Sequence, residues 1–315
     1  KFKFKQNLNK YKENIMSKPL IMHMITTAKN LSPFDVNMAY DAGWDKCVPY
    51  TSIETEEVEG IVQDTIFSRP PGLNKTGIFV GGRDPHKAIE MLNICKNSLV
   101  PPFTVSGFAD PSGAFTTAAG MIAKVEHTLK NNFQTSLKGL KVVVFGGTGP
   151  VGCIAGILAA SAGAEVIILG RKKEKCEELA LFCKDKYLDS SAMITGASNE
   201  EFDTQIEDID VVLASGAAGI QLVSEAQLKI ASKLKVAADV NAVPPSGVAG
   251  LDAMQDGKVL EGSVSGALGI GALAIGQVKY QAQNKLLKKM AGTDKPVFLD
   301  FYDALELARE YVSSK

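Results

Sequence analysis

The sequence predicts an α/β fold built from two domains. Short apolar runs alternate with helical patterns along the chain, glycines and prolines separate them, and 315 residues suffice for two cores. The hydrophobic fraction of 45% and the charged fraction of 22% suit a globular protein. We therefore expect parallel sheets covered by helices on both faces.

The first expected domain covers residues 16–138 and is completed by residues 270–315. Residues 1–15 carry five lysines that alternate with phenylalanine and polar residues, and we expect them to form an extra N-terminal segment. Ser32-Pro33 and Asp84-Pro85 each indicate a helix start. The other elements expected in this domain are strands at 20–25, 77–80 and near 103–105, and helices at 54–66 and 116–129.

A glycine-rich turn defines the second expected domain, residues 139–269. An apolar strand at 141–145 is followed by glycines in the Gly-x-Gly-x-x-Gly spacing and then by small residues that suit a helix. This order is typical of a Rossmann-like, doubly wound domain that binds a dinucleotide at the helix N-terminus. The residues expected to hold the phosphates are Gly147, Thr148, Gly149, Pro150, Val151 and Gly152.

The next strand, expected at 164–169, indicates which dinucleotide binds. A site selective for NAD usually has a carboxylate at the end of this strand, whereas this chain has Arg171 and Lys172. A guanidinium pairs with the 2′-phosphate of NADP, so we expect NADP as cofactor. The alternative is that Arg171, Lys172 and Lys173 form only a solvated first helical turn.

Two later loops follow strands expected at 211–214 and 236–238. Ligands bind at the carboxyl ends of the strands in such sheets. We expect Ser215 and Gly216 to contact the nicotinamide half of the cofactor. We expect Asn241, in the second loop, to bind the cofactor as well, and this loop to close a cleft between the two domains.

Charge and cysteine usage narrow the class of protein. A net charge of −1 with interspersed acids and bases argues against a nucleic-acid or membrane partner. The five cysteines show no metal-ligand spacing, and with no secretory signal they suit reduced thiols in the cytoplasm. The three histidines form no triad or metal set. We therefore expect no metal, and we expect the cofactor to carry the reaction.

Motifs that lie in order along most of the chain beyond Met16 carry a family resemblance. The chain resembles the NADP-dependent methylenetetrahydromethanopterin and methylenetetrahydrofolate dehydrogenases of methylotrophic bacteria. The matching motifs are Phe34-Asp35-Val36, Tyr40-Asp41-x-Gly43, Phe79-Val80-Gly81-Gly82, Thr116-Thr117-Ala118-Ala119, the 147–152 turn, Gly170-Arg171-Lys172, Asp239-x-Asn241-Ala242-x-Pro244-Pro245 and Gly266-Ala267-Leu268-Gly269-Ile270-Gly271.

The resemblance implies hydride transfer from a methylene-carrying reduced pterin to NADP, and a homo-oligomer in the form of a trimer. Asp35, Asp41 and Asp110 are the candidates for stabilising the positive charge that grows on the pterin. The family pattern has a lysine in the helix after Gly-Ile-Gly, where this chain has Ala274. Lys46 is the candidate to replace it.

Other functions remain open at this point. A shikimate-dehydrogenase-like NADP oxidoreductase could use Lys46 with Asp84 to move a hydroxyl proton. A catalytically inactive nucleotide-binding protein is a second alternative. The sequence does not discriminate tetrahydromethanopterin from tetrahydrofolate, and it leaves the oligomeric state open.

Overall fold

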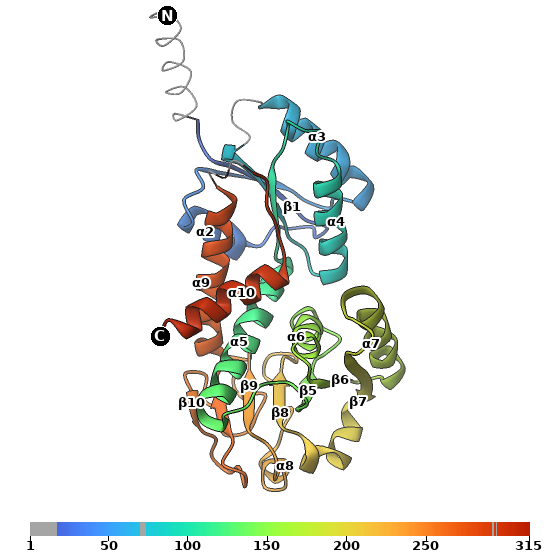
Figure 1. The fold of residues 1–315 in the computed structure, drawn as a ribbon, viewed down its shortest axis with the longest axis vertical. Helices are drawn as coiled ribbons and strands as arrows, with labels where there is room; N and C mark the ends of the chain where they lie inside the picture. The colour runs from blue at the N-terminus through green and yellow to red at the C-terminus, as the bar shows by residue number, and fades with distance from the viewer. Residues whose placement is uncertain (1–17, 70–73, 292, 294) are drawn as a thin grey trace, which may run out of the picture. The chain divides into compact units, whose positions relative to one another are not determined.

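The computed structural model describes residues 18–69, 74–291, 293 and 295–315, and Figure 1 shows its fold. The expected extra segment, 1–15, lies outside the described residues. The chain divides into two compact units. The first unit contains the described part of 1–113 together with 283–300, and the second contains 114–282 and 301–315.

The sheet of the first unit is parallel throughout, with the strand order β12-β4-β3-β1-β2. Its strands are β1 (Ile21–Ile25), β2 (Lys46–Tyr50), β3 (Thr76–Val80), β4 (Ser106–Ala109) and β12 (Phe298–Leu299). Its helices are α2 (Pro33–Asp41), α3 (Val58–Ser68), α4 (Pro85–Asn97) and the last residues of α9 (Ala272–Met290). This is the 2-1-3-4-5 order of flavodoxin-like sheets, whose ligands bind between the first and third strands.

Local sequence explains the helix starts in this unit. Pro33 and Pro85 occupy the first turns of α2 and α4, where the missing N–H costs nothing. Asp84 caps α4, because its carboxylate accepts hydrogen bonds from the backbone N–H groups of His86 and Lys87.

A buried tryptophan connects α9 to this unit. Trp44, which is 2% exposed, donates a hydrogen bond from Nε1 to the carbonyl of Leu287 at 3.1 Å.

The sheet of the second unit has the order β10-β11-β9-β8-β5-β6-β7, and only β10 is antiparallel. The six parallel strands follow the 3-2-1-4-5-6 order of a Rossmann-like fold, with β5 as the first strand. They are β5 (Lys141–Phe145), β6 (Glu165–Gly170), β7 (Met193–Ser198), β8 (Val211–Ala214), β9 (Val236–Asp239) and β11 (Leu268–Ile270), and β10 covers Asp256–Val259. The helices are α5 (Ala114–Phe133), α6 (Pro150–Ser161), α7 (Lys173–Tyr187), α8 (Glu225–Leu228), the first part of α9, and α10 (Phe301–Ser313).

Aromatic contacts stabilise the second unit at two places. The rings of Phe145 and Phe202 meet edge to face, with centroids 4.8 Å apart in the main core. Phe115 of α5 and Phe301 of α10 meet in the same way at 5.3 Å. The two units differ from the expected domains, since residues 114–138, 270–282 and 301–315 lie in the second unit, whereas we expected them in the first domain.

Several elements differ from the sequence-based expectation. The strand expected near 103–105 forms at Ser106–Ala109 instead, because Phe103 donates to the carbonyl of Val100 in a local turn. The strands β2, β10, β11 and β12 were not expected. β11 lies inside the glycine-containing motif at 266–271.

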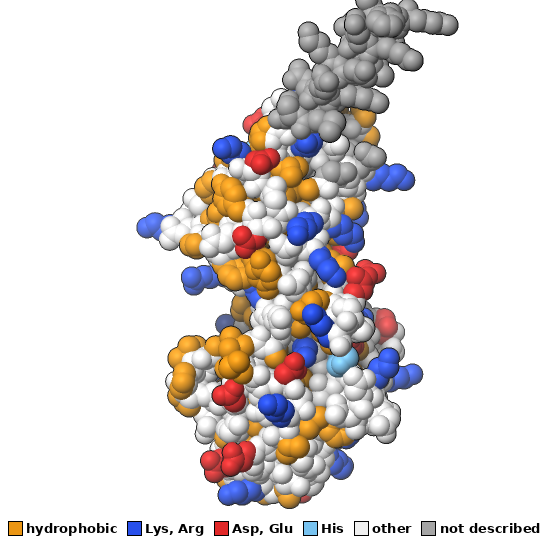
Figure 2. All heavy atoms as spheres, turned by 90° about the vertical axis from the view of Figure 1, so that its left-hand side faces the viewer, with side chains coloured by type: hydrophobic (Ala, Val, Ile, Leu, Met, Phe, Trp, Pro, Cys, Tyr) orange, Lys and Arg blue, Asp and Glu red, His pale blue; other side chains and the backbone are white. Residues whose placement is uncertain are grey.

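The surface carries both signs of charge. On the face that Figure 2 shows, acidic and basic side chains are interspersed with apolar ones. None of the helices in the described part of the chain combines the length and the apolar composition that crossing a bilayer requires.

Candidate functional site

The turn after β5 comes close to its neighbouring strands. Gly146 has a φ of +67°, and a Cβ built on it would lie 2.5 Å from the carbonyl oxygen of Ser215. A Cβ on Gly147 would overlap the Ile168 side chain. Gly146 must be glycine because of its positive φ, whereas Gly147 must be glycine because of close packing.

The helix α6 begins directly after this turn. Gly149 is the N-cap of α6, and Pro150 occupies its first turn, followed by Val151. A Cβ on Gly152 would lie 2.5 Å from both the carbonyl oxygen of Gly146 and Oγ of Ser215. The first N–H groups of a helix have no acceptor within it, so this end of α6 suits an anion such as pyrophosphate.

The residues after β6 provide positive charge at the same sheet edge. Thr148 is exposed beside Gly170, the last residue of β6, since a Cβ on Gly170 would lie 3.4 Å from Cγ2 of Thr148. Arg171 and Lys172 are exposed, and within the described residues their side chains form no hydrogen bond or ion pair. Lys173 is paired instead, with its Nζ 3.0 Å from Glu201. Arg171 and Lys172 are thus available to a phosphate.

The loop after β8 and the loop after β9 are each held in place by hydrogen bonds of their own residues. Ser215 follows β8, and its hydroxyl donates to the carbonyl of Phe145 at 2.7 Å, which ties the loop to the end of β5. A Cβ on Gly216 would lie 2.9 Å from the Leu222 side chain, so a side chain there would displace Leu222. The hydrogen bond to Phe145 and the short Cβ distances at Gly146 and Gly152 show that Ser215 lies directly against the glycine-rich turn.

Asn241 organises the loop after β9. Its amide nitrogen donates to the carbonyl of Pro245 at 3.0 Å, and its amide oxygen accepts from the backbone of Val243 at 2.9 Å. The carboxylate of Asp239 accepts from the backbone N–H groups of Asn241 and Gly247. Burial raises the pKa of Asp239, while those two donors oppose the rise. Asn241 thus shapes the loop with both ends of its side chain.

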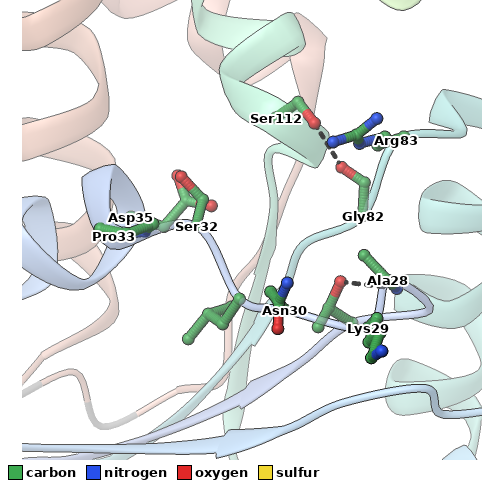
Figure 3. Close-up of a pocket in the computed structure, with 11 residues that line it drawn as sticks. Ala28, Lys29, Asn30, Ser32, Pro33, Asp35, Gly82, Arg83 and Ser112 are labelled. Atoms are coloured by element: carbon green, nitrogen blue, oxygen red, sulfur yellow. Dashed lines mark hydrogen bonds between the residues drawn. The ribbon is translucent and has the colours of Figure 1, made fainter.

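The first unit contains a cavity of about 620 Å³ at the carboxyl edge of its sheet. Figure 3 shows that its walls come from the loop after β1, the start of α2, the segment after β3 and the residue Ser112. This is the position between the first and third strands where such sheets bind ligands. The cavity is lined by Thr26, Ala28, Lys29, Asn30, Leu31, Ser32, Pro33, Asp35, Gly82, Arg83 and Ser112.

Asp35 is the carboxylate in this cavity. It lies in the first turn of α2 and is 3% exposed. The side-chain amide of Gln283, which is fully buried, lies 3.4 Å from Oδ1 of Asp35. A carboxylate at this place, in its ionised form, would stabilise positive charge on a bound molecule.

The structure does not bring the other predicted catalytic residues into this cavity. Asp41 is exposed at the last residue of α2, and Asp110 is fully buried after β4; neither lines the cavity. Lys46 begins β2 and is exposed at the amino edge of the sheet, opposite the loops that follow β1 and β3. Asp84 caps α4 after the carboxyl end of β3, so Lys46 and Asp84 lie at opposite edges of the sheet. Ala274 is partly buried in the first turn of α9.

Sequence reasoning did not identify Gln283, Lys29 or Asn30 as candidate site residues. The loop that holds Lys29 and Asn30 could have been identified, because it follows a predicted parallel strand at its carboxyl end. Gln283 gives no such signal, since 248 residues separate it from Asp35.

Comparisons with known proteins point to one family. The family model described as "Methylene-tetrahydromethanopterin dehydrogenase, N-terminal" matches residues 33–112. The chain is 43% identical over 293 residues to the NAD(P)-dependent methylenetetrahydromethanopterin dehydrogenase of Methylorubrum extorquens, covering 92% of this chain and 98% of the relative. It is 33% identical over 297 residues to the bifunctional protein MdtA of the same organism, covering 94% and 99%.

A solved structure supports the fold. Shikimate 5-dehydrogenase from Listeria monocytogenes matches with a TM-score of 0.51 and 15% identity, covering 93% of this chain and 96% of that chain. At this identity the likeness concerns the fold alone.

Proposed function

Because the chain belongs to the methylenetetrahydromethanopterin dehydrogenase family, we propose that it transfers a hydride from a methylene-carrying reduced pterin to NAD(P) in one-carbon metabolism. The observation that carries the proposal is the cavity of the first unit. Five residues of its lining, including the buried Asp35, lie within the segment that the family model matches.

The chemistry requires little acid–base assistance. The methylene carbon lies between two nitrogens; one of its C–H bonds breaks, and the hydrogen leaves with both electrons. The product is a methenyl cation whose charge is shared by the two nitrogens, so no base is needed to remove a proton. When bound, the nicotinamide ring of the cofactor accepts the hydride at C4.

The chain must therefore position the substrate and stabilise positive charge. We assign the second task to Asp35, because its carboxylate in the ionised form would be attracted more strongly to the methenyl cation than to the neutral substrate. Gln283 acts as a positioning residue, because its amide orients that carboxylate.

We further propose that NADP is preferred over NAD. The support is that β6 ends in Gly170 and is followed by Arg171 and Lys172, with no carboxylate there to accept the ribose hydroxyls. An unpaired guanidinium at this position can bind a 2′-phosphate through two parallel hydrogen bonds.

The test is an assay of the purified full chain with four substrate pairs. Methylenetetrahydromethanopterin and methylenetetrahydrofolate are each combined with NADP and with NAD, and the absorbance of the reduced nicotinamide is followed. Turnover with either pterin supports the proposed reaction. Binding of NADPH without turnover of either pterin would contradict it and would favour an inactive nucleotide-binding protein.

A further inference from the structure

The cavity of the first unit has two chemically different sides. Asp35 contributes a buried carboxylate from α2, whereas Arg83 contributes a guanidinium from the segment after β3 (Figure 3). Lys29 adds a second positive charge from the loop after β1. A molecule that fills this cavity therefore meets negative charge on one side and positive charge on another.

The backbone around Arg83 is anchored on both sides. The hydroxyl of Ser112 donates to the carbonyl of Gly82 at 2.7 Å, and Gly82 has a φ of +117°. A Cβ on Gly82 would lie 3.1 Å from Oγ1 of Thr27, so this conformation requires glycine. On the other side, Asp84 is held as the cap of α4. Arg83 thus projects from a backbone with little freedom to move.

The charge of Arg83 is not used inside the described part of the protein. Its side chain is exposed and forms no hydrogen bond or ion pair there. The carboxylate of its neighbour Asp84 is committed to the backbone N–H groups of His86 and Lys87 at 2.8 and 3.1 Å. Lys29 is also exposed and without a side-chain partner among the described residues.

Such an arrangement suits a ligand with an acidic group. An arginine on a preorganised backbone binds a carboxylate or phosphate with two parallel hydrogen bonds and loses less conformational freedom than one on a mobile loop. Lys29 can add a further charge to the same group without fixed geometry.

We propose that Arg83, assisted by Lys29, binds the anionic side chain of the pterin substrate. The inference rests on the proposed function, since it assumes a reduced pterin in this cavity. Tetrahydrofolate presents carboxylates, and tetrahydromethanopterin presents a phosphodiester together with carboxylates. Arg83 recognises the anion that both share.

The experiment compares Arg83→Gln and Arg83→Lys with the wild-type enzyme, and Lys96→Gln, an exposed lysine near the end of α4, is the control. KM and kcat are measured with both methylene pterins and with a synthetic methylene-tetrahydropterin whose side chain ends in an uncharged aniline. For the acidic pterins we expect Arg83→Gln to raise KM about tenfold to a hundredfold, with kcat nearly unchanged. Arg83→Lys should raise KM less, and the control should behave as wild type.

The uncharged substrate separates recognition from a structural effect. Its KM should be the same for the wild-type enzyme and Arg83→Gln, because it has no anion to lose. A KM for the acidic pterins that Arg83→Gln leaves unchanged overturns the inference, and so does an equal rise for the uncharged substrate. Comparison of the two acidic pterins shows whether a carboxylate or the phosphodiester is the main contact.

A binding measurement distinguishes failure of the inference from failure of the proposed function. Calorimetric titration with the unreactive tetrahydro forms of both pterins needs no turnover. If the wild-type chain binds a pterin in an Arg83-dependent manner without turning over its methylene form, the proposed reaction is wrong and the recognition stands. If it binds neither pterin, both are wrong.

Discussion

The side-chain amide nitrogen of Gln283 lies 3.4 Å from Oδ1 of Asp35, although 248 residues separate them in the chain. Both side chains are nearly or fully buried. α9 therefore contributes a side chain beside the carboxylate of Asp35, which lines the cavity of the first unit.

Asp35→Asn should lower kcat/KM without unfolding the protein. The substitution preserves shape and removes the negative charge that stabilises the methenyl cation. A charge-assisted interaction contributes about 1.5–3 kcal/mol, which corresponds to about a tenfold to 150-fold loss. Steady-state kinetics with the preferred pterin measure the effect. Asp64→Asn, at an exposed position of α3, is the control.

Unchanged kcat/KM in Asp35→Asn would refute the electrostatic role. Gln283→Glu offers an independent check, because it replaces the amide donor beside Asp35 by a second carboxylate of the same shape. We expect a loss of activity there as well, since repulsion displaces the Asp35 side chain.

Gly152→Ala should impair both stability and nucleotide binding. The added methyl group would lie 2.5 Å from the Gly146 carbonyl oxygen and the Ser215 hydroxyl, and relief of that overlap costs about 1–3 kcal/mol. Gly156→Ala is the matched control in the same helix, because its new Cβ would meet its nearest neighbours at 3.7 Å. The midpoint of thermal unfolding and the affinity for NADPH, measured for both variants, test this prediction. Equal behaviour of the two would show that the turn tolerates a side chain.

Arg171→Gln should reduce the preference for NADP. The loss of a charge-assisted pair with the 2′-phosphate is expected to raise the KM for NADP about tenfold to a hundredfold and to leave the KM for NAD within about twofold. Lys175→Gln, an exposed position two residues into α7, controls for the change in net charge. Parallel rises for both nucleotides would indicate a role in adenosine binding rather than in phosphate recognition.

His23 should make the stability of the first unit depend on pH. Burial, and next the positive charge of Arg69, lower the pKa of His23 below its usual 6.5. The unfolded chain therefore takes up the proton first, so stability is full above about pH 6.5 and falls as the pH decreases toward the lower pKa of the folded state. His23→Gln should remove this loss.

Fluorescence of Trp44 can follow that transition. It is the only tryptophan of the chain, and it is buried in the same unit as His23. Urea unfolding at several pH values, monitored by its emission, gives the stability of this unit. His127→Gln, on α5 of the second unit, should leave the pH dependence intact. A wild-type midpoint that does not change between pH 7 and pH 5 would contradict the prediction.

The sequence predicted the elements whose signals are local. The 147–152 turn, the strands around it and the Pro-initiated helices α2 and α4 depend on neighbouring residues, and all were expected. β2 was missed because it is an edge strand that contains Pro49, which local patterns assign to a loop. β11 was missed because a three-residue strand flanked by glycines carries too little periodicity.

The candidate site could be predicted only in part, because its residues lie far apart in the chain. Glycines of a nucleotide turn follow one another in the chain, whereas the cavity of the first unit collects residues from several loops. Asp35 was identified from the family resemblance, but no pattern in the sequence relates it to Gln283. The placement of Lys46 at the amino edge likewise depends on the register of β2 against β1.

Both sheets place their candidate ligand loops at the carboxyl ends of the parallel strands, so a change at the opposite edges lies far from those loops. The connection from α7 to β7 is one such place, where Asp189 accepts hydrogen bonds from the backbone N–H groups of Ser191 and Ala192 in a short exposed turn. A fluorescent label or an affinity tag inserted there would lie at the far end of the strands from the nucleotide turn. The protein thus offers a position at which it can be immobilised or tracked while its chemistry is measured.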